Sequence, residues 1–131
     1  MFRNDNQQTK DPIKQIESAI QDVPEQHISP TNAQRYAIQF NKLKAIAASQ
    51  VERLKEQLGD VKVTSRVLKK KAYTESTAKT VEEKRLDRDC DETYLESVKQ
   101  QEKIEASIEY LHTLVEVCGD YHIYFRQIGG S

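Results

Sequence analysis

The chain has 131 residues, of which 31% are charged and only 4 are glycine and 3 proline, so exposed helices are favoured over a sandwich or a barrel. Its length predicts one domain. No stretch approaches the roughly 20 apolar residues that a membrane-spanning helix needs, which excludes a membrane protein. Residues 1–10 lack the apolar segment of a signal peptide, so we expect a cytosolic protein.

The net charge of -1 hides an asymmetry along the chain. Residues 1–30 carry 3 basic and 5 acidic side chains, residues 31–74 carry 10 and 3, and residues 75–131 carry 7 and 13. The basic middle segment can pair with the acidic segment of the same chain or of a neighbouring copy. Whatever part of it stays uncovered will attract a polyanion.

The residues that could carry chemistry are few. Cys90 and Cys118 have no partner at the spacing of a metal site, and we interpret them as reduced structural thiols. His112 and His122 flank Cys118, but a structural zinc site needs four ligands, so we expect these histidines in a core or an interface. Phosphate-binding glycine loops and nucleophile or zinc-protease motifs are missing. The sequence therefore predicts no enzyme, no cofactor and no metal.

The first predicted element is a short amphipathic helix with a linker at residues 11–28. Asp11 and Pro12 form a cap with proline at the first helical position, and isoleucines then recur on one face. This apolar stripe must dock on the rest of the chain or on another protein. Residues 1–10 are polar, and we expect them to be disordered.

A helical hairpin is predicted for residues 29–128. Ser29 and Pro30 give its start signal, and apolar residues then follow at steps of 3 or 4 as far as Val61, the spacing of a helix packed lengthwise on a partner. Gly59 lowers the helix propensity there, so we expect a weakened or bent helix, with a break as the alternative. The fold class is all-α: a long antiparallel helical hairpin with a short N-terminal helix. One hairpin has little interior to bury, so we expect an oligomer.

The second arm of the hairpin follows a Thr- and Ser-rich turn near residues 73–80. Thr80 and Glu83 form a capping box, and the helix after it is polar at first. Its apolar stripe widens over residues 104–128, where we expect the contact between copies of the chain. Residues 129–131 are predicted to form a flexible end. The candidate oligomerisation residues are Ile104, Ile108, Leu111, Leu114, Val115, Cys118, Tyr121 and Phe125.

The feature that indicates a function most clearly is a basic cluster before the predicted turn. No acidic residue interrupts residues 62–71, and helical spacing places most of these cations on one side, where they could face a strand of phosphates. Tyr73 follows where a base could stack, and further cations resume across the turn. The plainer interpretation is a solvated face that pairs with Glu82, Glu83 and Asp87. The candidate nucleic-acid-binding residues are Lys62, Arg66, Lys69, Lys70, Lys71, Tyr73 and Lys79.

Four features follow one another in residues 30–128. Tyr36 and Phe40 stand near the start of the first long helix, the basic run ends in Tyr73, a Thr/Ser turn follows, and residues 107–118 read SIEYLHTLVEVC. In the order of these features and in the residue types that form them, the chain resembles the UvsY-type recombination mediators of tailed bacteriophages.

That resemblance implies a phage-encoded accessory protein that acts in the cytoplasm of the bacterial host cell, binds single-stranded DNA and assembles as a ring-like oligomer. It would load a RecA-like recombinase onto strands coated by single-strand-binding protein. By the same likeness, the DNA contact falls on the run around Arg66, Lys69, Lys70 and Lys71, and the assembly contact falls on the C-terminal apolar helix. One alternative is a protein-protein interaction module without DNA binding, such as a phage assembly chaperone or an inhibitor of a host protein. A duplex-binding architectural protein is another.

Overall fold

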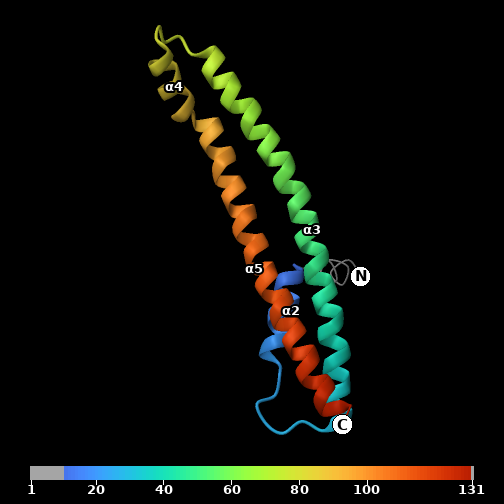
Figure 1. The fold of residues 1–131 in the computed structure, drawn as a ribbon. Helices are drawn as coiled ribbons and strands as arrows, with labels where there is room; N and C mark the ends of the chain where they lie inside the picture. The colour runs from blue at the N-terminus through green and yellow to red at the C-terminus, as the bar shows by residue number, and fades with distance from the viewer. Residues whose placement is uncertain (1–10, 131) are drawn as a thin grey trace, which may run out of the picture. The chain divides into compact units, whose positions relative to one another are not determined.

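The computed structural model describes residues 11–130, and all the regular structure in that part of the chain is helical, which confirms the predicted class (Figure 1). The helices are α2 (Pro12–Gln21), α3 (Pro30–Glu75), α4 (Val81–Asp89) and α5 (Glu92–Gly129). The disorder expected for residues 1–10 lies outside the described residues. At the other end, Gly129 belongs to α5, whereas a flexible end was expected from this residue onward, and Ser131 is again outside the described part.

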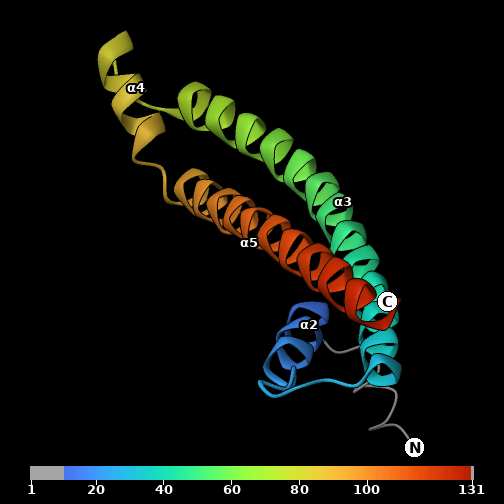
Figure 2. The ribbon, with the colours of Figure 1, turned by 60° about the horizontal axis from the view of Figure 1, so that its bottom comes forward.

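Two compact units share the long helices α3 and α5. The first unit, Met1–Glu52 with Glu109–Ser131, contains α2, the first part of α3 and the last part of α5. The second unit, Arg53–Ile108, contains the rest of α3, all of α4 and the first part of α5. Within each unit the α3 segment lies beside the α5 segment (Figure 1, Figure 2). The predicted packing of a long helix pair is therefore confirmed.

The core of the first unit is built around stacked aromatic rings. Phe40 on α3 and Phe125 on α5 are both 0% exposed. The Phe125 ring centroid lies 4.9 Å from that of Tyr36, and the Phe40 centroid lies 4.8 Å from that of Tyr121. Such offset stacks add to the free energy that burial of the large rings already supplies.

Helix α2 packs within the first unit through its predicted apolar stripe. Ile16 is 0% exposed, and the Asp11 carboxylate accepts the Ile13 N–H at 2.9 Å, which confirms the predicted cap. The Tyr110 hydroxyl of α5 donates to the Glu17 carboxylate, and this hydrogen bond raises the pKa of Tyr110. The stripe of α2 is thus covered by its own chain.

Helix α3 passes Gly59 without interruption, so the alternative of a break at this residue is wrong. Gly59 is exposed, and a Cβ atom added there would meet no atom within 4 Å. Leu58 and Val61, next to the glycine position, are half-buried, so the seam of the helix continues past Gly59.

We expect Gly59→Ala to raise the free energy of unfolding by about 0.5–1 kcal/mol, because glycine is about that much worse than alanine inside a helix. Equilibrium urea unfolding followed by circular dichroism measures it. The matched control is Gly129→Ala, where the new Cβ would lie 2.6 Å from Gln34 Cγ and 3.0 Å from Gln34 N, so this variant should be destabilised. A destabilised Gly59→Ala protein would contradict an open, regular helix at this position.

The connection and the second arm differ from the prediction in two ways. Helix α3 extends to Glu75, so Tyr73 belongs to the helix rather than to the turn. The Thr80 hydroxyl accepts the Glu83 N–H at 3.1 Å and begins α4, as predicted, but the arm is then interrupted at Cys90 and Asp91. The reason for the second difference is a cap that the sequence reading overlooked.

That cap begins α5 at residue 92. The Asp91 carboxylate accepts the Tyr94 N–H at 2.9 Å, which satisfies one of the amide groups that a helix start leaves unpaired. The helix then continues past Gly119 to Gly129, so the expected continuation through Gly119 is confirmed.

The interior of the second unit contains a polar contact. Ser65 on α3 and Ser97 on α5 are both 7% exposed, and the Ser65 hydroxyl donates to the Ser97 hydroxyl at 2.8 Å. The Ser97 hydroxyl in turn donates to the Tyr94 carbonyl at 2.6 Å. Helix α4 contributes no buried residue to this unit. The second unit therefore relies on hydrogen bonds and half-buried side chains more than the first does.

Candidate nucleic-acid interface

The predicted basic residues on one flank of α3 line two adjacent depressions in the second unit. One has a volume of about 350 Å³ and the other of about 370 Å³. Arg66 and Lys69 line both, so the two depressions form one continuous surface, which we call the basic groove. The first depression is lined by Arg66, Lys69, Lys70, Tyr73, Arg85 and Arg88. The second is lined by Lys62, Ser65, Arg66, Lys69, Tyr94, Val98 and Gln101.

Helical geometry explains why these α3 residues come together. Successive residues of an α-helix are rotated by about 100°. The side chains at positions 62, 66, 69, 70 and 73 therefore share one arc of α3, next to the seam that contains Ser65. The structure brings together these five of the seven predicted residues.

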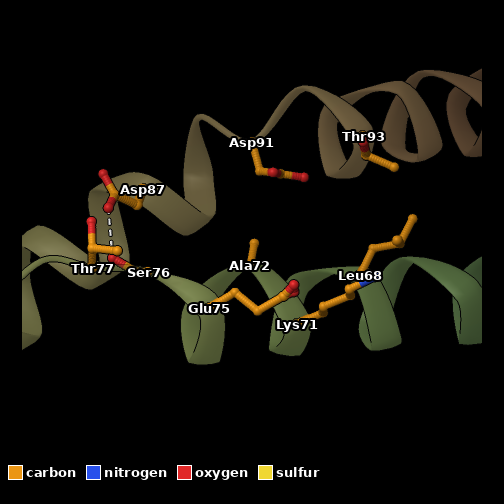
Figure 3. A pocket seen from close by; sticks show the side chains of 9 residues that line it. All are labelled: Leu68, Lys71, Ala72, Glu75, Ser76, Thr77, Asp87, Asp91 and Thr93. Atoms are coloured by element: carbon orange, nitrogen blue, oxygen red, sulfur yellow. Dashed lines mark hydrogen bonds between the residues drawn. The ribbon is translucent and has the colours of Figure 1, made fainter.

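Lys71 and Lys79 lie elsewhere. Lys71 lines a third depression, of about 460 Å³, on the other flank of the seam (Figure 3). Glu75, Asp87 and Asp91 line the same depression, so Lys71 has an acidic environment there. Lys79 is exposed in the connection between α3 and α4 and lines neither depression of the basic groove. A DNA contact from these two lysines would have to be made outside the groove.

Helix α4 supplies a second wall that the candidate residues did not include. Arg85 and Arg88 face the α3 cations in the first depression. The helix is held in place by polar contacts: the Ser76 hydroxyl donates to Asp87 at 2.6 Å, and Lys84 Nζ donates to the Ser76 carbonyl at 3.3 Å. The cations across the turn were visible in the sequence as a resumed basic run, but nothing in the sequence indicated which of them would face α3.

Tyr94 is a further residue that sequence reasoning missed. It lies in the first turn of α5 and lines the second depression together with Lys62 and Arg66. Its position follows from the cap at Asp91, which starts α5 so that Tyr94 comes next to α3. Only recognition of that cap in the sequence could have found it.

The plainer interpretation required the basic cluster to pair with acidic residues across the turn. Within residues 11–130, no ion pair joins the α3 cations of the groove to Glu82, Glu83 or Asp87. Asp87 accepts the hydrogen bond from Ser76 instead. The α3 wall of the groove therefore keeps its positive charge available for an anion.

One ion pair does lie at the groove. Arg88 Nε is 2.9 Å from the Asp89 carboxylate, and the two side chains are 24% and 56% exposed. The hydrogen bond from Arg88, together with the nearby charge of Lys69, lowers the pKa of Asp89, and the same bond raises the pKa of Arg88. Both groups thus stay charged around neutral pH. Because the pair is exposed, solvent screens it and it contributes little to stability.

The candidate oligomerisation residues occupy two settings. Four of them are packed inside the first unit of a single chain, where each is at most 4% exposed: Leu111, Leu114, Cys118 and Phe125. Burial also raises the pKa of the Cys118 thiol. The other four are half-buried: Ile104, Ile108, Val115 and Tyr121. The most exposed apolar side chains of α5 are instead Ile123 and Tyr124, at 48% and 53%. A contact between copies stays a prediction.

In the described part of the chain, no group of three or more His, Cys, Asp and Glu side chains is arranged to hold a metal ion. His122 Nδ1 lies 2.9 Å from the Ala37 carbonyl and must donate to it, so this ring serves the packing of the first unit. None of the helices in residues 11–130 combines the length and the apolar character needed to cross a bilayer.

Comparison with protein-family models, with curated proteins and with solved structures gives no match for this chain. Its function is therefore inferred from the residues and from the geometry of the basic groove.

Proposed function

We propose that this protein is a recombination mediator that binds single-stranded DNA in the basic groove. In this role it helps a RecA-like recombinase to load onto strands coated by single-strand-binding protein. The observation that carries the DNA-binding part is the groove itself. Cations from α3 and α4 converge there, and within residues 11–130 no ion pair joins a carboxylate to the α3 cations that line the groove.

The chemistry of the groove suits a phosphate chain more than a small anion. Two joined depressions spread their cations along α3, so one phosphate could not satisfy them all, whereas successive phosphates of a strand could. Each contact releases counterions from the nucleic acid and strengthens binding at low salt. Phosphates carry no sequence information, so binding should not depend on sequence.

The mediator role rests on the resemblance to UvsY-type proteins, and it adds a homo-oligomer to the proposal. Several copies would present several grooves to one strand, and each weak contact would then act at the high effective concentration set by the others. A strand held in this way is kept open for the recombinase while the coating protein leaves.

A protein-protein interaction module is the second candidate, and one observation favours it. Val63 and Val67 on α3 are 55% and 60% exposed and lie beside the cations of the groove. An apolar strip flanked by positive charge fits a protein partner with acidic and apolar side chains. In that case the groove would bind a protein and not a nucleic acid.

Fluorescence anisotropy separates the candidates. Labelled single-stranded and duplex oligonucleotides of equal length are titrated with the protein at two salt concentrations, and light scattering gives its mass. We expect tighter binding of the single strand, with the logarithm of the association constant falling by about 0.7 for each phosphate contact per tenfold rise in salt. Absence of binding at low ionic strength would remove the DNA-binding proposal, and a preference for duplex would favour an architectural protein.

The loading step has its own assay. A single strand is first coated with single-strand-binding protein, and filament formation by a RecA-like recombinase is then followed with and without this chain. We expect the chain to shorten the lag before filaments form. If it binds the strand but leaves the lag unchanged, the DNA-binding part of the proposal stands and the mediator part falls.

A further inference from the structure

The side chain of Tyr94 differs in its contacts from those of the other five tyrosines. Tyr36, Tyr121 and Tyr124 all make ring contacts in the first unit, and the Tyr110 hydroxyl donates to Glu17. The Tyr73 ring lies below Lys84, whose Nζ is 5.9 Å from its centroid. Within residues 11–130, the Tyr94 side chain has no ring-stacking, cation–π or hydrogen-bond partner, and only the charge of Arg88 acts on its hydroxyl group.

The backbone of Tyr94 is fixed at both ends, in contrast to its unused side chain. Its N–H donates to the Asp91 carboxylate at 2.9 Å, and its carbonyl accepts the hydrogen bond of the buried Ser97 hydroxyl at 2.6 Å. Ser97 is itself bonded to Ser65 on α3. A half-buried ring on such a backbone is held at the groove at little further entropic cost, which is the property of a preformed contact.

The two depressions of the groove repeat the same arrangement. Each combines Arg66 and Lys69 with one tyrosine, Tyr73 in the first and Tyr94 in the second. Arg88 lines the first depression with Tyr73, and the electrostatic influence of Tyr94, like that of Tyr73, helps to raise the pKa of Arg88. Two aromatic rings thus flank a shared set of cations.

We infer that Tyr73 and Tyr94 form a pair of base-stacking positions on either side of a shared phosphate position, and that Tyr94 gives the groove its preference for single strands. This inference rests on the proposed DNA binding and deepens it. Aromatic rings stack on any base because every base has a π-face, whereas the bases of a duplex are already stacked on each other.

The offset of the two depressions supports an unstacked strand. The α3 residues that line them are displaced by about one helical turn, roughly 5.4 Å along the axis. Neighbouring bases in a duplex strand are separated by about 3.4 Å. A strand that placed two adjacent bases at positions offset in this way would be more extended than one strand of a duplex.

The test compares two labelled probes of equal length, an oligothymidylate and an abasic deoxyribose-phosphate strand, in anisotropy titrations. We expect Tyr94→Leu to weaken binding of the oligothymidylate by roughly 5- to 150-fold, the effect of losing one base stack. Binding of the abasic strand should stay unchanged, because it contacts only the cations. Tyr94→Phe keeps the ring and should bind both probes like the unmodified protein.

Controls distinguish the role of Tyr94 from the proposed DNA binding on which it rests. Leu95→Ala changes an exposed neighbour on α5, 41% exposed, and should bind both probes normally. Equal losses for both probes in Tyr94→Leu would give the residue a purely structural role, and no loss for either would exclude it from the site; both results overturn the inference. If the unmodified protein binds neither probe, the proposed DNA binding itself fails.

Discussion

Replacement of both Arg66 and Lys69 by glutamate should weaken binding of single-stranded DNA by at least about 100-fold. These two residues line both depressions of the groove, so they are the cations that every occupant must meet. A hydrogen bond to a charged group contributes about 1.5–3 kcal/mol, and about 1.4 kcal/mol corresponds to a factor of ten. Anisotropy titration at several salt concentrations measures the loss, and the salt slope should fall by about 1.4 with two phosphate contacts removed.

The chain offers a control with the same change of charge. Lys71 and Lys79 lie on α3 and in the connection after it, outside both depressions of the groove. Their replacement by glutamate should weaken binding only slightly, through the long-range field. If the two double variants lost the same affinity, binding would depend on net charge in this region and not on the groove.

The largest expected effect on stability comes from Phe125→Ala. The ring is 0% exposed and stacks on Tyr36, at 4.9 Å between centroids, and on Phe40, at 5.9 Å. Truncation of a buried phenylalanine costs about 3–5 kcal/mol, a large share of the about 5–15 kcal/mol that keeps a typical domain folded. Urea unfolding monitored by circular dichroism should show a strongly lowered midpoint.

Tyr124→Ala is the matched control for that variant. Tyr124 is the next residue along α5 and touches the Phe125 ring edge-on, but it is 53% exposed. Its truncation should cost well under half as much, because most of the ring stays in water in the folded protein. Comparable losses in the two variants would mean that the aromatic cluster is not the centre of the first unit.

The helices and most of their caps could be predicted from the sequence. Apolar residues at steps of 3 and 4 identify the seam of α3, and the caps at Asp11 and Thr80 mark the starts of α2 and α4. The second cap of the long arm, at Asp91, was missed because no proline or glycine accompanies it and Cys90 gives no breaking signal. A lone aspartate in a charged stretch is indistinguishable in sequence from an ordinary surface residue.

The basic groove could be predicted only as far as one helix determines it. Positions 62, 66, 69, 70 and 73 follow from helical rotation alone, and the same rotation places Lys71 on another flank, which a reading of the basic run as one block overlooks. Arg85, Arg88 and Tyr94 come from other helices. Their approach to α3 depends on tertiary packing, which no local pattern encodes.

The apolar stripe of α5 illustrates a different limit of prediction from sequence. Its width predicted that the helix touches more than one neighbour. In the first unit these neighbours include α3, whose Phe40 and Tyr36 stack on Tyr121 and Phe125. A stripe alone cannot separate contacts within a chain from contacts between copies, because both bury the same kind of surface.

The hydrogen bond between Ser65 and Ser97 also fixes the register of α3 against α5 in the second unit. Purely aliphatic seams can slip by a turn at small cost, since one apolar side chain replaces another. Here a slip would leave the buried Ser65 hydroxyl without its acceptor, at about 1–3 kcal/mol, while the Ser97 hydroxyl would keep its bond to the Tyr94 carbonyl. The buried Ser65–Ser97 hydrogen bond thereby keeps Arg66 on α3 beside Tyr94 on α5. The spacing between the cation and the ring at the surface thus depends on two small side chains inside the unit.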